Sequence, residues 1–325
     1  MKPLLSIENL RMDLKDPQGD RSGSVLRGVQ LTLWQGEKIA LVGESGCGKS
    51  MTALSVLNLL PNPPMTITAG QIHFKGKNLL ELTEPEWREV RGREIGIVFQ
   101  EPFTSLNPVL RVGDQVAEIL NIHSGLGASQ VNEKVLSLLG EVGLPDPERI
   151  ARQYPHQLSG GMCQRVMIAM AIACGPSLLI ADEPTTALDV TVQAQILDLL
   201  YRMTETHKMA VLLITHDLRI AQGHADRVAI LYAGQVVEEA APPRLFEHPQ
   251  HPYTEGLLEA LPEFSHKGRP LSTIKGLVRS PFETTGGCAF ASRCPKVEQK
   301  CSREEPSLLE IGKEHWVRCF YPSGK

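Results

Sequence analysis

The chain has 325 residues, of which 42% are hydrophobic and 22% charged, and its formal net charge is −4. This composition is typical of a soluble globular protein with one large domain and an appendage, or with two domains. No apolar run approaches the roughly 18 residues that a membrane-spanning helix needs, and the N-terminus, which carries Glu8, is unlike a signal peptide. The sequence therefore excludes an integral membrane protein and predicts a cytoplasmic one, in which thiols stay reduced.

In chain order, short β-type runs alternate with helical ones, which predicts an α/β fold with a mainly parallel sheet. A buried strand over residues 38–43 is expected to lead into a helix over residues 49–60, and residues 112–152 have apolar side chains at helical spacing. Other strands are expected over residues 4–10, 24–34, 71–74, 94–99, 177–182, 209–215 and 227–238. A helix is expected over residues 255–262, and the remainder, rich in Gly, Pro and Cys, is expected to be irregular.

The first motif that carries chemistry is GESGCGKS, between the buried strand and the helix that follows it. It fits the phosphate-loop pattern, in which glycines let backbone N–H groups curl around a phosphate at the positive end of a helix. Lys49 would reach the β- and γ-phosphates, and Ser50 would ligate Mg²⁺. Because Cys47 lies near Lys49 and the start of the helix, we expect its thiol to have a lowered pKa and its alkylation to block ATPase activity.

The second motif, SLLIADEP, is an apolar run that ends in two carboxylates. A buried strand would deliver Asp182 at its carboxyl end, where the side chain would hold Mg²⁺ through water. Glu183 would polarise the attacking water as general base. A capped strand end before a proline turn explains the motif alone equally well, and the phosphate loop in the same chain favours the catalytic interpretation.

The third motif, LSGGMCQR, places Ser159, Gly160 and Gly161 at the start of a helical segment. This is a second turn suited to a phosphate, in a chain that already has a phosphate loop. We interpret it as serving a nucleotide held by a different subunit. An N-capped helix after a glycine turn would explain the serine but not both glycines.

With these motifs in this order, residues 4 to about 240 resemble the ATPase subunits of ABC transporters. The resemblance identifies Gln100, at the end of VFQ, with the glutamine that contacts Mg²⁺ and the water. His216 of ITHD is similar to the histidine that reaches the γ-phosphate, and Asp189 of ALDV matches the loop that crosses the dimer interface. The resemblance implies dimers with two ATP molecules between subunits, and a segment near EPFTSLNP that touches membrane partners.

The resemblance also implies ATP and Mg²⁺ as ligands and completes the set of expected site residues. Glu183, His216 and Gln100 are expected to be catalytic, and Ser50, Gln100 and Asp182 to hold Mg²⁺. The residues expected to bind the nucleotide are Gly43, Glu44, Ser45, Gly46, Cys47, Gly48, Lys49, Ser50, Met51, Gln100, Asp182, Ser159, Gly160, Gly161 and Asp189.

Two positions depart from the family's pattern. Leu14 stands where an aromatic side chain usually stacks on adenine. Because base stacking is worth ~1–3 kcal/mol in nucleic-acid complexes, we expect weaker ATP binding or an aromatic ring from elsewhere in the chain. Met162 stands where many members have Gln, which removes one polar contact with the nucleotide.

The segment HPYTEGLLEALP and the cysteine-bearing tail after it resemble the subfamily that energises dipeptide, oligopeptide and nickel importers. The resemblance implies peptide uptake, with nickel or another small solute as the alternative. The implied partners are a second homologous ATPase subunit in a heterodimer or homodimer, two integral permeases and an extracytoplasmic peptide-binding protein. The implied location is peripheral, at the cytoplasmic face of the inner membrane.

Two other classes explain the sequence less well. A soluble ABC protein that remodels nucleic acid or ribosomes usually has two cassettes or long coiled-coil inserts, and this chain shows neither, so no nucleic-acid partner is expected. An exporter ATPase for lipids or drugs would not explain the cysteine-bearing tail.

The tail contains four cysteines, Cys288, Cys294, Cys301 and Cys319, in the spacing C-x5-C-x6-C-x17-C. Structural zinc sites usually contain a C-x2–4-C pair, whereas an iron–sulfur cluster needs four thiolates and tolerates wider spacing. The residues alone allow three interpretations: the four cysteines bind an iron–sulfur cluster, bind a zinc ion, or bind no metal. The resemblance to peptide-importer ATPases implies a 4Fe–4S cluster, with Zn²⁺ as the alternative.

The predicted fold is therefore a P-loop ABC-type ATPase core with an antiparallel β subdomain and a helical subdomain over about residues 103–165. We expect a nucleotide-binding domain over residues 1–240 and a C-terminal extension over residues 241–325 that carries the four cysteines.

Overall fold

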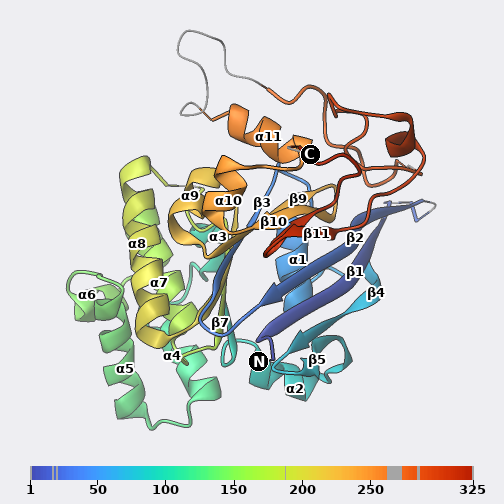
Figure 1. The fold of residues 1–325 in the computed structure, drawn as a ribbon. Coiled ribbons are helices and arrows are strands. Elements are labelled where there is room, and N and C mark those ends of the chain that lie inside the picture. The colour runs from blue at the N-terminus through green and yellow to red at the C-terminus, as the bar shows by residue number, and fades with distance from the viewer. Residues whose placement is uncertain are drawn as a thin grey trace. The chain divides into compact units, whose positions relative to one another are not determined.

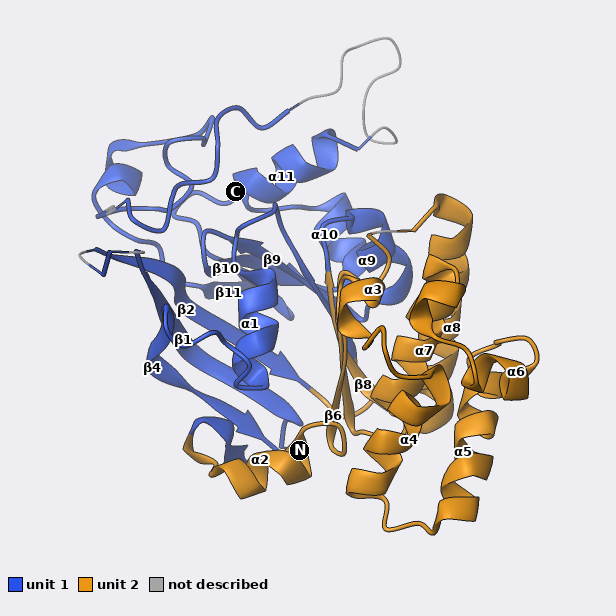
Figure 2. Ribbon diagram, turned by 180° about the vertical axis from the view of Figure 1, so that it is seen from behind, with its two compact units in different colours: residues 1–33, 38–80, 215–325 blue, residues 34–37, 81–214 orange. Residues whose placement is uncertain are grey.

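The computed structural model describes residues 2–16, 18–19, 21–186, 188–261, 273–283 and 286–323. The chain divides into two compact units (Figure 2). The first unit consists of residues 1–33, 38–80 and 215–325, and the second unit of residues 34–37 and 81–214. Segments far apart in the sequence therefore share a unit, and the domain boundary expected at residue 240 stays a prediction.

The first unit contains the predicted antiparallel sheet. Its strands are β1 (Leu5–Lys15), β2 (Ser22–Leu33), β4 (Met65–Phe74) and β5 (Lys77–Asn78), in the order β2-β1-β4-β5. Ile7, Leu10 and Met12 of β1 are all buried. Their spacing departs from strict alternation because the register shifts between Ile7 and Leu10, where Asn9 has a left-handed φ of 48°.

The first unit also contains strands in the order β11-β12-β10-β9-β3. They are β3 (Lys38–Val42), β9 (Arg227–Tyr232), β10 (Gln235–Ala240), β11 (Leu309–Gly312) and β12 (His315–Val317). β3 and β9 run parallel, and the other neighbours run antiparallel. This part of the sheet is therefore mixed.

Two expectations for these strands are wrong. The single strand expected over residues 227–238 is two strands, because the chain turns at Ala233 and Gly234, whose φ values are 45° and 76°. A Cβ at Gly234 would lie 2.2 Å from the backbone oxygen of Val25, so the turn needs glycine. The tail expected to be irregular also contributes the β11–β12 hairpin, which pairs with β10.

The first unit also contains α-helices and a 3₁₀ turn. They are α1 (Lys49–Val56), α9 (Leu218–His224), α10 (Pro242–Glu247), α11 (Pro252–Glu259) and the 3₁₀ turn η3 (Gln299–Ser302). α1 ends before the expected residue 60, because Asn58 has a left-handed φ of 51°. α11 is the helix expected over residues 255–262, and Pro262 lies outside the described residues.

The second unit contains three parallel strands in the order β8-β7-β6. They are β6 (Ile95–Val98), β7 (Leu178–Asp182) and β8 (Ala210–Thr215), of which the last residue, Thr215, is counted with the first unit. Every residue of β7 and β8 is buried. Strands covered on both faces are continuously apolar, which is why the sequence predicts them well.

The helices of the second unit include the predicted helical segment, within which α4 and α5 lie side by side (Figure 1). Of the helices in the described residues, none is both long and apolar enough to cross a membrane. The helical elements of the unit are α2 (Glu84–Val90), α3 (Pro102–Ser105), α4 (Val112–His123), α5 (Ala128–Glu141), α6 (Pro147–Ala151), η2 (Pro155–Gln157), α7 (Gly160–Ile172) and α8 (Val190–His207).

Candidate nucleotide-binding site

The phosphate loop connects β3 to α1 in the first unit, the arrangement that its motif requires. Gly48 caps α1 with a φ of 110°, a conformation that other residues rarely adopt. A Cβ at Gly43 would lie 2.2 Å from the backbone oxygen of Leu231. Ser45 and Gly46 are exposed at the tip of the loop. The glycines therefore bring the loop close to β9 and leave its tip open to solvent.

Lys49 is held within this loop. Its side chain is buried, with 5% of the residue exposed, and Nζ donates to the backbone oxygens of Gly43 at 2.8 Å and Glu44 at 3.1 Å. Ser50 and Met51 follow in the first turn of α1. The ammonium thus lies against the loop that is predicted to cradle the phosphates, a position consistent with contacts to bound phosphate.

Cys47 contradicts one expectation from the sequence. The residue is only 1% exposed, and burial raises the pKa of its thiol to about 11, although the charge of Lys49 acts in the opposite direction. The expected lowering of the pKa is therefore wrong: the side chain points into the protein, and the loss of hydration outweighs the nearby ammonium.

The two carboxylates of the second motif lie at the carboxyl end of β7 in the second unit. Asp182 is the last residue of the strand and is 7% exposed. Glu183 has a left-handed φ of 45°, and its N–H donates to the backbone oxygen of Ile214 at 2.9 Å. A non-glycine residue in this conformation is uncommon and often marks a functional position. The conformation turns Glu183 away from the direction of the strand.

Glu183 and Gln100 lie together, as a shared catalytic role requires. Gln100 follows β6, and its Nε2 donates to Oε2 of Glu183 at 3.3 Å. The hydroxyl of Thr186 donates to the same oxygen at 2.9 Å. Sequence reasoning missed Thr186; the signal was its place three residues after Glu183, in a turn where a hydroxyl can reach back to the carboxylate.

The LSGG turn begins α7. Ser159 is the N-cap, and its hydroxyl accepts from the N–H of Met162 at 3.4 Å. A Cβ at Gly161 would lie 2.8 Å from Cγ1 of Val192 in α8, whereas one at Gly160 would make only ordinary contacts. Packing against α8 therefore explains why residue 161 is glycine. It does not explain the glycine at position 160, for which close approach of a ligand is one physical reason.

Asp189 and His216 occupy two helix starts, one in each unit. Asp189 caps α8 by accepting from the N–H groups of Thr191 and Val192 at 3.1 and 3.0 Å; Ala187 of the same motif lies outside the described residues. In the first unit His216 is exposed, directly before Asp217, the N-cap of α9. Burial raises the pKa of Asp217, but hydrogen bonds from Arg219 outweigh it and hold that pKa below its usual value.

The structure places Leu14 on β1, half-buried and paired with Gly23 and Met65. Beside the loop tip the first unit has a cavity of about 330 Å³, which Gly46 lines together with Arg279 and Pro281 of the C-terminal extension. The described residues that line this cavity include no aromatic ring. The structure therefore offers no aromatic replacement for Leu14 there. The lining side chains include the flat guanidinium groups of Arg11, Arg27 and Arg279.

The four tail cysteines meet at one small apolar cavity of about 20 Å³ in the first unit. All seven cysteines of the chain are free thiols. Burial, and then the proximity of the other three tail thiols, raises the pKa of Cys319 to about 11. However, no group of three or more His, Cys, Asp or Glu side chains in the described part of the chain is arranged to hold a metal ion.

A phosphate loop that enters a helix, carboxylates after a buried parallel strand and a capped LSGG turn together define an ABC-type P-loop ATPase. Residues 26–186 match the ABC transporter family model, and residues 237–301 match that of the oligopeptide/dipeptide transporter C-terminal region.

Curated relatives match over nearly the whole chain. The dipeptide transport ATP-binding protein DppD of Bacillus subtilis (strain 168) is 45% identical, over 98% of this chain and 95% of that protein. The oligopeptide transport ATP-binding protein AppD of the same organism is 46% identical, over 98% and 97%. DppD of Escherichia coli (strain K12) is 45% identical, over 90% of each chain. The chain therefore belongs to the ABC transporter family, as an ATPase subunit.

Solved structures agree in fold. A dimeric, post-hydrolysis structure of the ATP-binding cassette MJ0796 bound to ADP and Pi is 30% identical, with a TM-score of 0.65 over 73% of this chain and 98% of that one. CbiO1 from Clostridium perfringens, part of the cbiONQ complex, is 26% identical, with a TM-score of 0.64 over 76% and 92%. The predicted ABC ATPase fold is thus confirmed.

Proposed function

We propose that this chain is the ATP-hydrolysing subunit of an ABC importer that takes up dipeptides or oligopeptides. The observation that carries the proposal is the match of residues 237–301 to the oligopeptide/dipeptide transporter C-terminal region, in a chain that aligns nearly end to end with peptide transport ATP-binding proteins. A cassette alone would support any ABC transporter, whereas this extension favours peptides over nickel or another small solute as the substrate.

In the first unit, the phosphate loop from Gly43 to Met51 binds the phosphates of ATP, and Lys49 contacts the β- and γ-phosphates. Its burial against the loop supports this role, because the ammonium needs little rearrangement to meet an anion there. Ser50 would hold Mg²⁺, which would supply positive charge beside the phosphates. His216, also in this unit, contacts the γ-phosphate.

In the second unit, Asp182 and Gln100 hold Mg²⁺, and Glu183 accepts a proton from the attacking water. The hydrogen bonds from Gln100 and Thr186 support this assignment, since both orient the carboxylate of Glu183.

Ser159, Gly160 and Gly161 contact the ATP held by a second ATPase subunit, and Asp189 lies at the interface between the two. The dimeric form of MJ0796 supports this arrangement, and so does Gly160, which packing within the chain does not require. The second subunit is a homologous ATPase, in a heterodimer or a homodimer. Two ATP molecules then hold the dimer closed until hydrolysis releases it.

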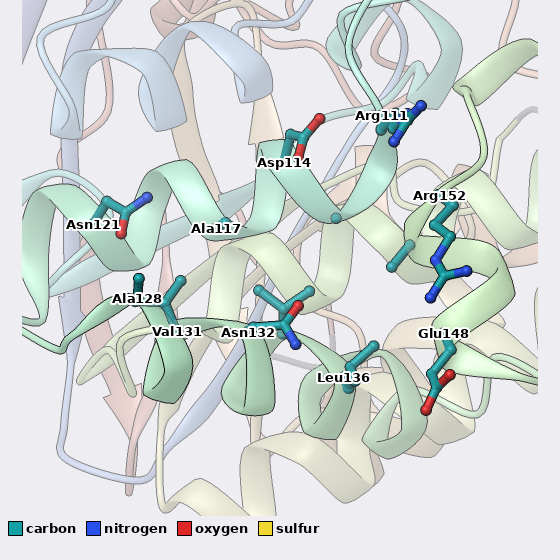
Figure 3. Close-up of a pocket in the computed structure, with 13 residues that line it drawn as sticks. Arg111, Asp114, Ala117, Asn121, Ala128, Val131, Asn132, Leu136, Glu148 and Arg152 are labelled. Atoms are coloured by element: carbon teal, nitrogen blue, oxygen red, sulfur yellow. The ribbon is translucent and has the colours of Figure 1, made fainter.

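The surface for the membrane permeases lies on the second unit, around α3 and α4. Several large apolar side chains are exposed there: Phe103 at 50%, Val109 at 76% and Leu110 at 38%. Next to them, α4, α5 and α6 enclose a cavity of about 480 Å³ (Figure 3). Exposed apolar side chains beside a cavity are typical of a protein–protein contact. This contact would hold the chain at the cytoplasmic face of the inner membrane.

The test is transport by the complex reconstituted in vesicles with its two permeases and its extracytoplasmic binding protein. With ATP on the side of this subunit, labelled dipeptides or oligopeptides accumulate, and the same complex with Glu183→Gln accumulates none. Uptake of nickel with no uptake of peptide would contradict the proposed substrate. ATP hydrolysis with no uptake of either solute would contradict the role as an importer.

We further propose that Cys288, Cys294, Cys301 and Cys319 hold a 4Fe–4S cluster, with Zn²⁺ as the alternative. Four thiols that line one apolar cavity fit the donor set of such a cluster, although their present spacing is not that of a coordination sphere. The metal centre would cross-link the segments of the tail that carry the four cysteines. Iron, sulfide and zinc analysis after anaerobic purification tests this, with Cys294→Ser as the variant that loses the metal. A folded wild-type protein with neither metal would contradict the proposal.

A further inference from the structure

The C-terminal extension contacts the phosphate loop directly, through Arg293. Its guanidinium forms a two-pronged ion pair with the carboxylate of Glu44, the second residue of the loop motif, at 2.7 Å (Nη1–Oε2) and 3.0 Å (Nη2–Oε1). The Arg293 side chain is 4% exposed and that of Glu44 is 28% exposed. A parallel pair of charge-assisted hydrogen bonds fixes both the distance and the orientation of its two partners.

The extension itself holds Arg293 in this orientation. Nε donates to the backbone oxygen of Lys275 at 3.1 Å, and Nη2 also donates to that of Ile274 at 3.3 Å. The guanidinium carbon lies 5.7 Å from the centre of the Tyr232 ring. These contacts leave the guanidinium little freedom, so that Glu44 is bound to a group with one available geometry.

Glu44 is held through its backbone as well. Its N–H donates to the hydroxyl of Tyr253 at 3.1 Å, and its backbone oxygen accepts from Nζ of Lys49 at 3.1 Å. Tyr253 is fully buried and packs on Tyr232 and Phe290, with ring centres 4.6 and 5.4 Å away. Phe290, like Arg293, belongs to the extension. The extension therefore supports Glu44 at its side chain directly and at its backbone through Tyr253.

We propose that Arg293 is a positioning residue of the phosphate loop, so that nucleotide affinity depends on a residue outside the ATPase cassette. The inference rests on the proposed role of the loop in binding phosphate. Arg293 does not touch the reacting atoms. It holds Glu44, and with it the carbonyl groups that orient Lys49, in the shape that the phosphates require.

The first test compares Arg293→Ala with the wild type for binding and turnover of MgATP. Because hydrogen bonds between charged groups are among the strong ones and the loop loses two of them, we expect a KM and a Kd for MgATP raised by about tenfold or more. Because Arg293 does not touch the reacting atoms, we expect kcat to stay within about threefold. Arg293→Lys keeps the charge but loses the two-pronged geometry, so its values should lie between. The double variant Arg293→Ala/Glu44→Gln should bind MgATP no more weakly than the weaker-binding single variant. The reason is that both substitutions remove the same ion pair.

A second readout needs no nucleotide. Cys47 lies buried in the same loop, so its alkylation rate, followed by mass spectrometry of its peptide, reports how often the loop opens. We expect Arg293→Ala to raise this rate by about tenfold or more in nucleotide-free protein. If the wild type failed to bind ATP, the proposed function would be contradicted, and the alkylation rates would still decide the role of Arg293.

Lys296→Ala is the matched control. Lys296 is a basic residue of the same extension whose ion pair, at 2.9 Å, joins it to Glu255 of α11 and not to the loop. We expect its MgATP affinity and Cys47 alkylation to equal those of the wild type. Equal effects from Lys296→Ala and Arg293→Ala would overturn the proposal, as would a folded Arg293→Ala protein with unchanged values. If Arg293→Ala does not fold, Glu44→Gln replaces it, and an unchanged Cys47 rate there would overturn the proposal equally.

Discussion

The two units differ in how they hold their functional groups. In the second unit, Asp189 is held by the first turn of its own helix. Glu183 accepts hydrogen bonds from nearby Thr186 and from Gln100, which lies 83 residues earlier in the chain. In the first unit the phosphate loop depends on a partner about 250 residues away, since Glu44 pairs with Arg293. Both units therefore use long-range contacts, but the phosphate loop is held by the C-terminal extension, whereas the predicted base Glu183 is held from within the second unit.

The largest expected effect lies in the second unit. Glu183→Gln removes the proposed base while keeping the size of the side chain, so hydrolysis should fall by about 10²–10⁴-fold. ATP affinity should change little, because the binding loop lies in the other unit. Single-turnover hydrolysis and equilibrium ATP binding measure the two effects separately. Near-normal turnover would show that Glu183 is not the base.

The next effect concerns Cys47 in the first unit. Since its pKa is raised to about 11 by burial, only a small fraction of the thiol is ionised near neutral pH. Its alkylation rate should therefore rise about tenfold per pH unit from pH 7 to pH 10 without reaching a plateau. Saturating nucleotide should slow the reaction further. A plateau below pH 9 would mean that the loop is open and that the thiol is hydrated.

A substitution at Gly43 probes the contact between the loop and β9. In Gly43→Ala the new Cβ would meet the backbone oxygen of Leu231 at 2.2 Å, so the loop must shift. We expect ATP affinity to fall by about ten- to a hundredfold. Gly46→Ala is the control, since nothing lies within 4 Å of its Cβ position, and its smaller effect reflects only the φ of 79°. Equal losses in the two variants would contradict the account of Gly43.

The smallest expected effects are changes in the free energy of unfolding when each of the two glycines of the LSGG turn is replaced by alanine. Gly161→Ala would push against Val192, which should lower the free energy of unfolding by about 1–3 kcal/mol. Gly160→Ala makes only ordinary contacts and should leave stability unchanged or raise it by about 0.5–1 kcal/mol. Thermal or urea unfolding measures both. If Gly160→Ala also spares ATPase activity of the assembled dimer, its proposed contact with the second subunit's ATP is wrong.

Much of the fold was predictable because its signals are local. The buried strand before Gly43, the strand that ends at Asp182 and the helix start at Ser159 each depend on a few consecutive residues. The β9–β10 turn was missed because Ala233 and Gly234 interrupt a run that is otherwise uniformly strand-like. The β11–β12 hairpin was missed because its short strands are stabilised by pairing with β10 rather than by their own composition.

In the candidate site, too, local features could be predicted from the sequence, whereas features that depend on packing or on distant residues could not. The sequence predicts that Gln100 and Glu183 act together, and the structure brings them within hydrogen-bonding distance. It gives the wrong direction for the pKa of Cys47, because the charge of Lys49 is visible in the sequence whereas burial is a result of packing. The pairing of Glu44 with Arg293 could not be predicted, since nothing in either local sequence points to the other.

The central claim is that ATP hydrolysis by this chain is coupled to peptide uptake, and peptide-stimulated ATPase activity tests it most directly. In the reconstituted complex, peptide-loaded binding protein should raise the rate of ATP hydrolysis by several-fold over the empty binding protein. The stimulation should vanish with Glu183→Gln. A hydrolysis rate that is the same with and without peptide, in a complex that binds both peptide and ATP, would contradict the claim.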